Sequence, residues 1–128
     1  MEKASSGVVR AVHEIAAETV GGARGTTRQV LIGADEAPNF ALRRFVMQPG
    51  GGMPKHTNSV EHEQYVLGGR ASIGIGEDVV DVRAGSVVFI PAGMPHWYRV
   101  EGDEPFEFLC AVPNARDEVT VLEEYSAG

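Results

Sequence analysis

The length of 128 residues is that of a single domain with one hydrophobic core. A formal net charge of −7 argues against nucleic acid or an anionic membrane surface as a partner. The one cysteine, Cys110, excludes an intrachain disulfide and fits a reducing compartment. Because the first residues lack a signal-peptide core and no stretch approaches the ~20 apolar residues of a membrane span, we expect a cytoplasmic protein.

The N-terminal segment, residues 1–27, is predicted to be an arm that precedes the folded domain of residues 28–128. Its stretch 8-VVRAVHEIAAETV-20 fits a short helix or an extended arm about equally well. Arms of this kind often pair with the sheet edge of a second subunit and so cover an exposed strand. We therefore expect a homodimer in which the arms are exchanged or pair with edges.

From residue 28 onward, short runs of strand-forming residues alternate with turn residues. The turn signals include the run 49-PGGG-52 and the pair Gly68-Gly69. Many short strands at 8–12-residue spacing are typical of an all-β sandwich or barrel. The predicted strands are 28–33, 40–47, 64–67, 70–76, 79–82, 86–90, 96–100, 106–112 and 119–125.

Three of the four histidines lie in two segments where turn residues recur at particular offsets, and only His13, read as a surface residue, lies outside them. The first segment contains, in order, Gly50, His56, Asn58, His62 and Gly69, and the second contains Gly85, Pro91, Gly93 and His96. On an extended chain, residues two apart, such as His56 and Asn58, point to the same side. Converging histidines of this kind favour a metal site over isolated surface residues.

These two patterns resemble the motifs of the cupin superfamily, G-x5-H-x-H-x(3,4)-E-x6-G and G-x5-P-x-G-x2-H-x3-N. The stretches 24-RGTTRQVLIGADEAPNFALRRFVMQPGG-51, EHEQYVLGG and 106-FEFLCAVP-113 are similar to the small four-histidine, single-domain cupins that carry manganese. The resemblance covers residues 24–113. It implies an all-β fold, a small antiparallel β-barrel or double-stranded β-helix of jelly-roll type, with one metal ion inside.

The sequence departs from the superfamily motifs at three positions. Asn58 stands at the second histidine of the first motif, His62 at its acidic position, and Val100 at the last position of the second motif. The resemblance implies that Asn58 is a weak fourth ligand through its amide oxygen or a hydrogen bonder behind the ligands, or else that the site has decayed. The implied metal ligands are His56, His62 and His96, with Asn58.

Two glutamates flank His62 and are the alternative acidic ligands. The looser motif spacing would admit Glu63, but the six intervening residues that the motif requires before Gly69 place the acidic position at His62. Strand alternation then directs Glu61 and Glu63 to the opposite, solvated face.

Alternation also predicts which side chains share the barrel interior with the histidines. Gln64 follows His62 onto the inner face and Tyr98 follows His96, so both are candidate catalytic residues that would bind substrate and orient the ligands. Cys110 alternates with Phe106 and Phe108 on a late strand that would line the same cavity. The plainer role for Cys110 is that of a small buried hydrophobic residue.

Three neutral imidazoles leave the charge of a divalent ion uncompensated and coordination positions open, which favours catalysis on an anionic ligand. We expect Mn or Fe, while Zn, Ni or Co suit the same donors. The predicted function is a metal-dependent oxidoreductase, of dioxygenase or peroxide-using type, acting on a small organic molecule. The alternatives are a non-redox metal-dependent lyase, isomerase or cyclase, and a non-catalytic small-molecule binding protein.

Overall fold

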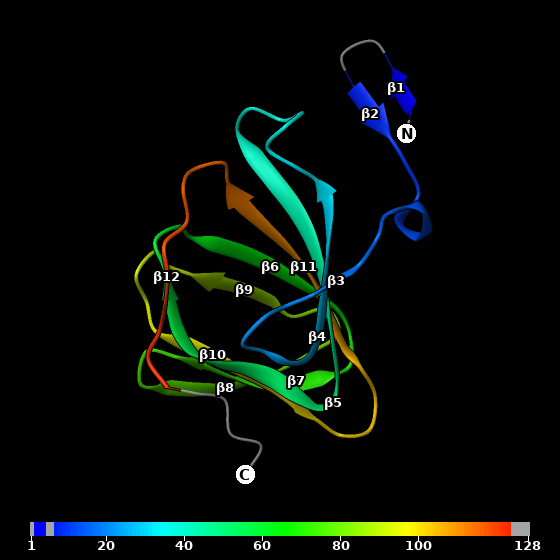
Figure 1. The fold of residues 1–128 in the computed structure, drawn as a ribbon. Helices are drawn as coiled ribbons and strands as arrows, with labels where there is room; N and C mark the ends of the chain where they lie inside the picture. Colours follow the sequence, from blue (N-terminus) through cyan, green and yellow to red (C-terminus); the bar gives the residue numbers. More distant parts are fainter. Residues whose placement is uncertain (1, 5–6, 124–128) are drawn as a thin grey trace.

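The computed structural model describes residues 2–4 and 7–123, most of which form one curled antiparallel sheet (Figure 1). The order of its main strands is β8-β7-β10-β5-β11-β6-β9, with β4 beside β5 and β3 beside β4. The elements are β1 (Glu2–Ala4), β2 (Gly7–Val9), η1 (Val12–Glu14), β3 (Glu18–Thr19), β4 (Arg24–Ile32), β5 (Phe40–Asn58), β6 (His62–Gly68), β7 (Arg70–Ile75), β8 (Asp78–Arg83), β9 (Val87–Ile90), β10 (His96–Glu101), β11 (Phe106–Pro113) and β12 (Val119–Val121). The predicted all-β barrel fold is confirmed.

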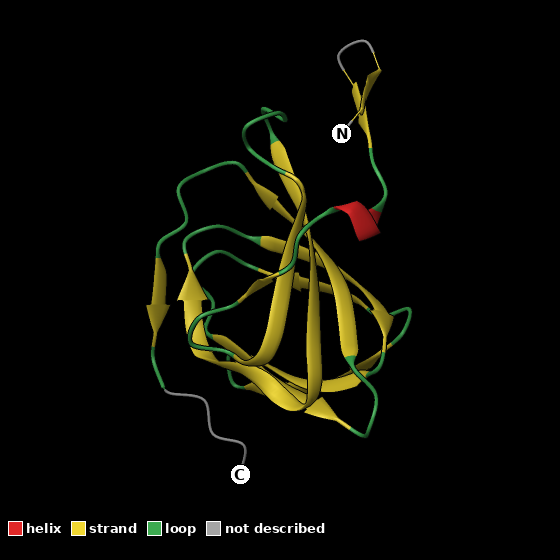
Figure 2. Ribbon diagram, turned by 45° about the vertical axis from the view of Figure 1, so that its right-hand side comes forward, coloured by secondary structure: helices red, strands yellow, loops and turns green. Residues whose placement is uncertain are grey.

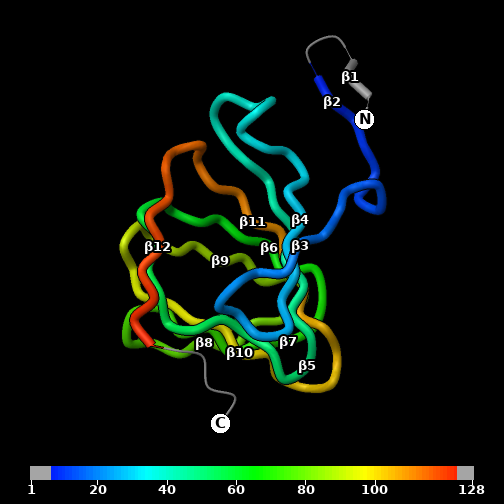
Figure 3. Tube along the Cα trace, in the orientation of Figure 1, coloured from blue at the N-terminus to red at the C-terminus, as the bar shows by residue number. Residues whose placement is uncertain are grey.

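β5 is much longer than predicted, because it runs through the Pro-Gly-Gly-Gly stretch that was expected to end it. Gly50 has a φ of 82°, a conformation that favours glycine. A Cβ atom at Gly51 would lie only 2.5 Å from the carbonyl oxygen of Arg24. The glycines therefore let the strand bend closely against β4, and β5 continues from the β4 and β11 side of the barrel to the β10 and β12 side (Figure 3).

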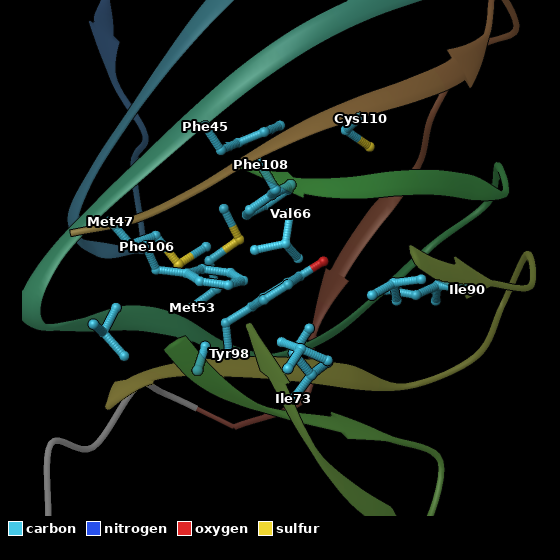
Figure 4. Close-up of a cluster of buried hydrophobic side chains, with 14 of the residues drawn as sticks. Phe45, Met47, Met53, Val66, Ile73, Ile90, Tyr98, Phe106, Phe108 and Cys110 are labelled. Atoms are coloured by element: carbon cyan, nitrogen blue, oxygen red, sulfur yellow. The ribbon is translucent and has the colours of Figure 1, made fainter. Parts of the chain in front are cut away.

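The barrel interior changes from apolar to polar along neighbouring strands. On β6 the inward residues run from Val66 through Gln64 to His62, all buried. On β10 the corresponding order is Val100, Tyr98, His96. At the apolar end, rings from β5, β10 and β11 lie side by side (Figure 4). The hydrophobic core thus fills one end of the barrel, and imidazoles line the other end.

The outer face of β10 carries Trp97, as alternation predicts. Its indole ring lies so close to Gly74 of β7 that a Cβ atom there would overlap it. The guanidinium of Arg99 lies 5.5 Å from the Trp97 ring centroid. Trp97 therefore packs on the outside of the sheet and takes no part in the pocket.

The N-terminal segment is neither one helix nor one extended arm. β1 and β2 pair as a hairpin that projects away from the barrel, and the short η1 turn follows (Figure 2). β3 already pairs with β4, so the predicted boundary at residue 28 falls inside β4. The last predicted strand, 119–125, is observed only to Val121, and its residues 124 and 125 lie outside the described residues. None of the described helical segments is long and apolar enough to span a membrane.

Candidate metal centre

The three predicted histidine ligands come together from three strands: His56 from β5, His62 from β6 and His96 from β10. The ring centroids of His56 and His96 are 4.2 Å apart, and those of His62 and His96 are 5.9 Å apart. The register places His96 opposite His56 across the β5–β10 pair, which explains the close approach. All three line one pocket of about 130 Å³. Their exposed fractions are only 9%, 7% and 1%.

Two of these imidazoles are held in the tautomer that suits a metal. Nδ1 of His56 lies 2.7 Å from the Pro54 carbonyl oxygen, and Nδ1 of His96 lies 3.0 Å from that of Met94. A carbonyl only accepts hydrogen bonds, so each Nδ1 carries the proton and each Nε2 keeps its lone pair. Metal-ligating histidines are commonly oriented in this way. Burial lowers the pKa of His96 to about 4, so the ring is neutral at neutral pH.

His62 carries a buried nitrogen without a protein partner. Its Nδ1 lies 3.3 Å from the Cys110 sulfur, while its Nε2 is buried and has no hydrogen-bond partner among the described residues. The pKa of His62 is lowered to about 4, mainly by burial and to a smaller extent by the Arg43 charge. An unsatisfied buried polar atom is costly, and a metal ion would satisfy it.

Asn58 is buried at the same pocket, and its amide is oriented by a carboxylate. Its Nδ2 donates to Oδ2 of Asp117 at 2.8 Å, and the backbone N–H of Ser59 donates to Oδ1 of Asp117 at 3.0 Å. The carboxylate only accepts, so the amide must present its nitrogen to Asp117. Oδ1 of Asn58 is left buried and without a partner. That oxygen is available as the fourth donor.

The donor set therefore fits a divalent ion. His56 and His96 each keep a lone pair on Nε2, and Nε2 of His62 and Oδ1 of Asn58 have no partner among the described residues. As the side chains stand, no three His, Cys, Asp or Glu residues in the described ranges form a ready ligating group.

Gln64 and Tyr98 meet beside the histidines. Nε2 of Gln64 donates to the Tyr98 hydroxyl at 2.7 Å and approaches the Cys110 sulfur at 3.7 Å. Burial raises the pKa of Tyr98 well above its usual range, so the phenol remains protonated. Because Gln64 occupies the hydroxyl as an acceptor, the phenolic proton can be donated to a molecule in the pocket.

Asp117 and Arg43 are among the pocket residues that escaped the sequence prediction. Asp117 is 59 residues from Asn58, and no local pattern links them. Arg43 belongs to an apolar run of β5, where strand alternation puts it on the inner face with Ala41, Phe45 and Met47. Alternation is therefore a signal that would have found Arg43. Its neighbour Arg44 makes an ion pair with Glu107 at 2.8 Å on the outer side.

Other sequence predictions hold in the structure. Glu61 and Glu63 are exposed, as is His13. Phe106, Phe108 and Cys110 share the inner face of β11 and are fully buried.

Comparison with known proteins extends these observations. A polyketide cyclase, RemF from Streptomyces resistomycificus, is 30% identical over 94% of this chain and 89% of its own, with a TM-score of 0.82. Rru_A2000 from Rhodospirillum rubrum, a cupin-2 domain, is 31% identical over 86% of this chain and 74% of its own, with a TM-score of 0.74. No curated protein matches the sequence.

More distant structures share the fold alone. Oxalate decarboxylase from Bacillus subtilis is 19% identical over 87% of this chain and 31% of its own, with a TM-score of 0.73. The model of the Cupin_2 family, described as a cupin domain, matches residues 43–112, which is more than half of the chain. The chain is therefore a small single-domain cupin and belongs to the Cupin_2 family.

Proposed function

We propose that this protein is a metal-dependent cupin cyclase that closes a ring in a small poly-carbonyl molecule without net oxidation or reduction. The observation that carries the proposal is the near full-length similarity to a polyketide cyclase, at 30% identity over 94% of the chain. The buried imidazole pocket supports it, because the pocket offers donors for a Lewis-acidic ion among largely apolar walls.

The proposed metal ligands are His56, His62 and His96, with Asn58 as an oxygen donor. When bound, a divalent ion would supply Lewis acidity to a substrate carbonyl oxygen. Imidazole and amide donors admit Mn, Fe, Co, Ni or Zn, so the donor set does not select one metal.

Tyr98 and Gln64 are the proposed catalytic and positioning side chains. The Tyr98 hydroxyl would donate a hydrogen bond to a substrate oxygen as negative charge develops there, while Gln64 holds the phenol in place at 2.7 Å. The pocket walls of Phe45 and Phe108 would fold a flexible chain so that its reacting atoms meet, which lowers the entropic part of the barrier.

A dioxygenase or peroxide-using oxidoreductase is the second candidate. It is favoured by the same three neutral imidazoles, which leave open positions and attract anionic ligands, and by the resemblance to manganese cupins.

Oxygen dependence separates these two functions. Linear poly-β-keto acids would be incubated with the protein under argon and in air, after chelation and reloading with zinc or manganese. For the cyclase we expect cyclised product under argon with either metal, and loss of product after chelation or in His62→Ala. Product that forms only in air, with consumption of oxygen, would instead establish the oxidoreductase.

We also propose a homodimer. Apolar side chains are exposed on the outer face of β6 and of the edge strand β9, where Tyr65 lies opposite Val87. Tyr65, Leu67, Val87 and Phe89 form this surface, the β6–β9 patch. Exposed apolar patches and strand edges commonly mark protein interfaces.

A further inference from the structure

Arg43 is a half-buried cation that lines the pocket, and no carboxylate of the described residues forms an ion pair with it. Its Nε is buried and has no hydrogen-bond partner among the described residues, and its Nη2 meets only the weak sulfur acceptor of Cys110, at 3.6 Å. The side chain as a whole is half-buried, and a buried polar atom without a partner, such as this Nε, destabilises a fold. Such a group is retained where function requires it.

The other charged residues of the pocket are already engaged. Arg28 makes an ion pair with Glu18 at 2.8 Å. The carboxylate of Asp117 accepts hydrogen bonds from Asn58 and from the backbone of Ser59. Arg43 therefore gives the pocket a positive charge that no lining residue in the described part of the chain pairs with.

Arg43 lies close to the histidine cluster. The Cys110 sulfur contacts both residues: it lies 3.6 Å from Nη2 of Arg43 and 3.3 Å from Nδ1 of His62. One thiol thus separates the guanidinium from a proposed metal ligand. A small molecule bound in this pocket would reach both groups.

The remaining wall beside Arg43 is aromatic. The guanidinium carbon lies 5.1 Å from the Phe45 ring centroid. Phe45 stacks on Phe108 at 5.1 Å between centroids, and Phe108 stacks on Tyr98 at 5.4 Å (Figure 4). The pocket therefore joins an apolar, aromatic wall to the guanidinium of Arg43.

We propose that Arg43 anchors the anionic end of the substrate, a carboxylate or an ionised enol attached to an apolar or aromatic body. Arg43 lines the pocket, and a guanidinium binds the two oxygens of a carboxylate through paired hydrogen bonds. This inference rests on the proposed function, since it names the substrate class of the same pocket.

The test compares binding of 2-naphthoate with that of its uncharged analogue 2-naphthamide, by fluorescence titration of the full chain. Wild type should bind the anion more tightly than the amide. In Arg43→Gln the affinity for 2-naphthoate should fall about tenfold or more, as for a lost charge-assisted hydrogen bond. The affinity for 2-naphthamide should stay nearly unchanged.

Arg44→Gln is the matched control, because Arg44 is the neighbouring arginine on the outer face, paired with Glu107. It should bind both probes like wild type. Arg43→Lys keeps the charge but loses the forked geometry, and should recover part of the lost affinity. Equal affinity of Arg43→Gln and wild type for 2-naphthoate would overturn the proposal, as would a preference of wild type for the amide.

All titrations are repeated on chelator-treated protein and on His62→Ala. The contribution of Arg43 should persist in both, because the guanidinium needs no metal to bind an anion. If the protein does not cyclise the poly-β-keto acids but Arg43→Gln still binds 2-naphthoate more weakly than wild type, only the proposed cyclase function is refuted. If the protein does cyclise them but Arg43→Gln and wild type bind 2-naphthoate equally well, only the role of Arg43 as the anion anchor is refuted.

Discussion

At the scale of single residues, Asn58 is the clearest departure from the family pattern, and the structure gives it a partner. Asp117 holds the amide nitrogen at 2.8 Å and leaves Oδ1 unpartnered in the pocket. An amide oxygen is a weak donor to a transition metal compared with imidazole. Under the proposed metal binding, residue 58 would therefore affect how strongly the pocket retains an ion.

Replacing Asn58 with histidine should strengthen metal binding. An imidazole at 58 would have Asp117 as its carboxylate partner, an arrangement that orients a ligand and raises its basicity. We expect Asn58→His to lower the zinc dissociation constant about tenfold or more, in line with the size of such effects. Competition with a chromophoric chelator measures this. His13→Asn, a change at an exposed histidine, should leave the constant unaltered. Unchanged affinity in Asn58→His would mean that residue 58 does not face the ion.

The sequence was informative about pocket residues whose position depends on spacing and alternation. The count from Gly69 selected His62, and the structure places His62 in the pocket while both flanking glutamates are exposed. Asp117 could not be predicted in this way, because its contact with Asn58 depends on how the segment before β12 folds back. Arg43 was read as part of an apolar run, although the same alternation rule places it inside.

At the scale of the elements, strands bounded by clear turns were predicted to within a few residues. β5 was not, because glycine is a poor strand former by intrinsic preference and the Pro-Gly-Gly-Gly run looks like a turn. The reason for the glycines is tertiary. β4 crosses so close to Gly51 that no side chain fits there, a contact that a single sequence does not reveal.

Gly51→Ala should therefore destabilise the barrel more than an ordinary glycine substitution. The new Cβ atom would meet backbone oxygens of Arg24 and Gln48 at 2.5 and 2.8 Å, and backbone cannot move aside easily. We expect the free energy of unfolding in urea to fall by about 2 kcal/mol or more. Gly68→Ala is the matched control, since a Cβ atom at Gly68 meets nothing within 4 Å. Similar losses in both variants would show that close approach to β4 is not the cause.

At the scale of the whole molecule, the motif spacing was enough to identify the fold and the family. The glycines, proline and histidines of the two motifs fix turns and inward positions, so they constrain the barrel directly. The surface outside the motifs is less determined by spacing. The β6–β9 patch arises because Tyr65 and Leu67 alternate outward on β6, beside the outward Val87 and Phe89 of β9.

Disrupting this patch should separate the proposed dimer without damaging the pocket. Phe89 is exposed, whereas its neighbours Val88 and Ile90 point into the barrel, so Phe89→Asp changes only the outer face. We expect wild type to be a dimer by light scattering after size exclusion and Phe89→Asp to be a monomer with unchanged zinc affinity. Val79→Asp, at an exposed valine of the opposite edge strand β8, should remain dimeric. A monomeric wild type would refute the dimer. A dimeric Phe89→Asp would place the interface elsewhere, with the projecting β1–β2 hairpin as the next surface to remove.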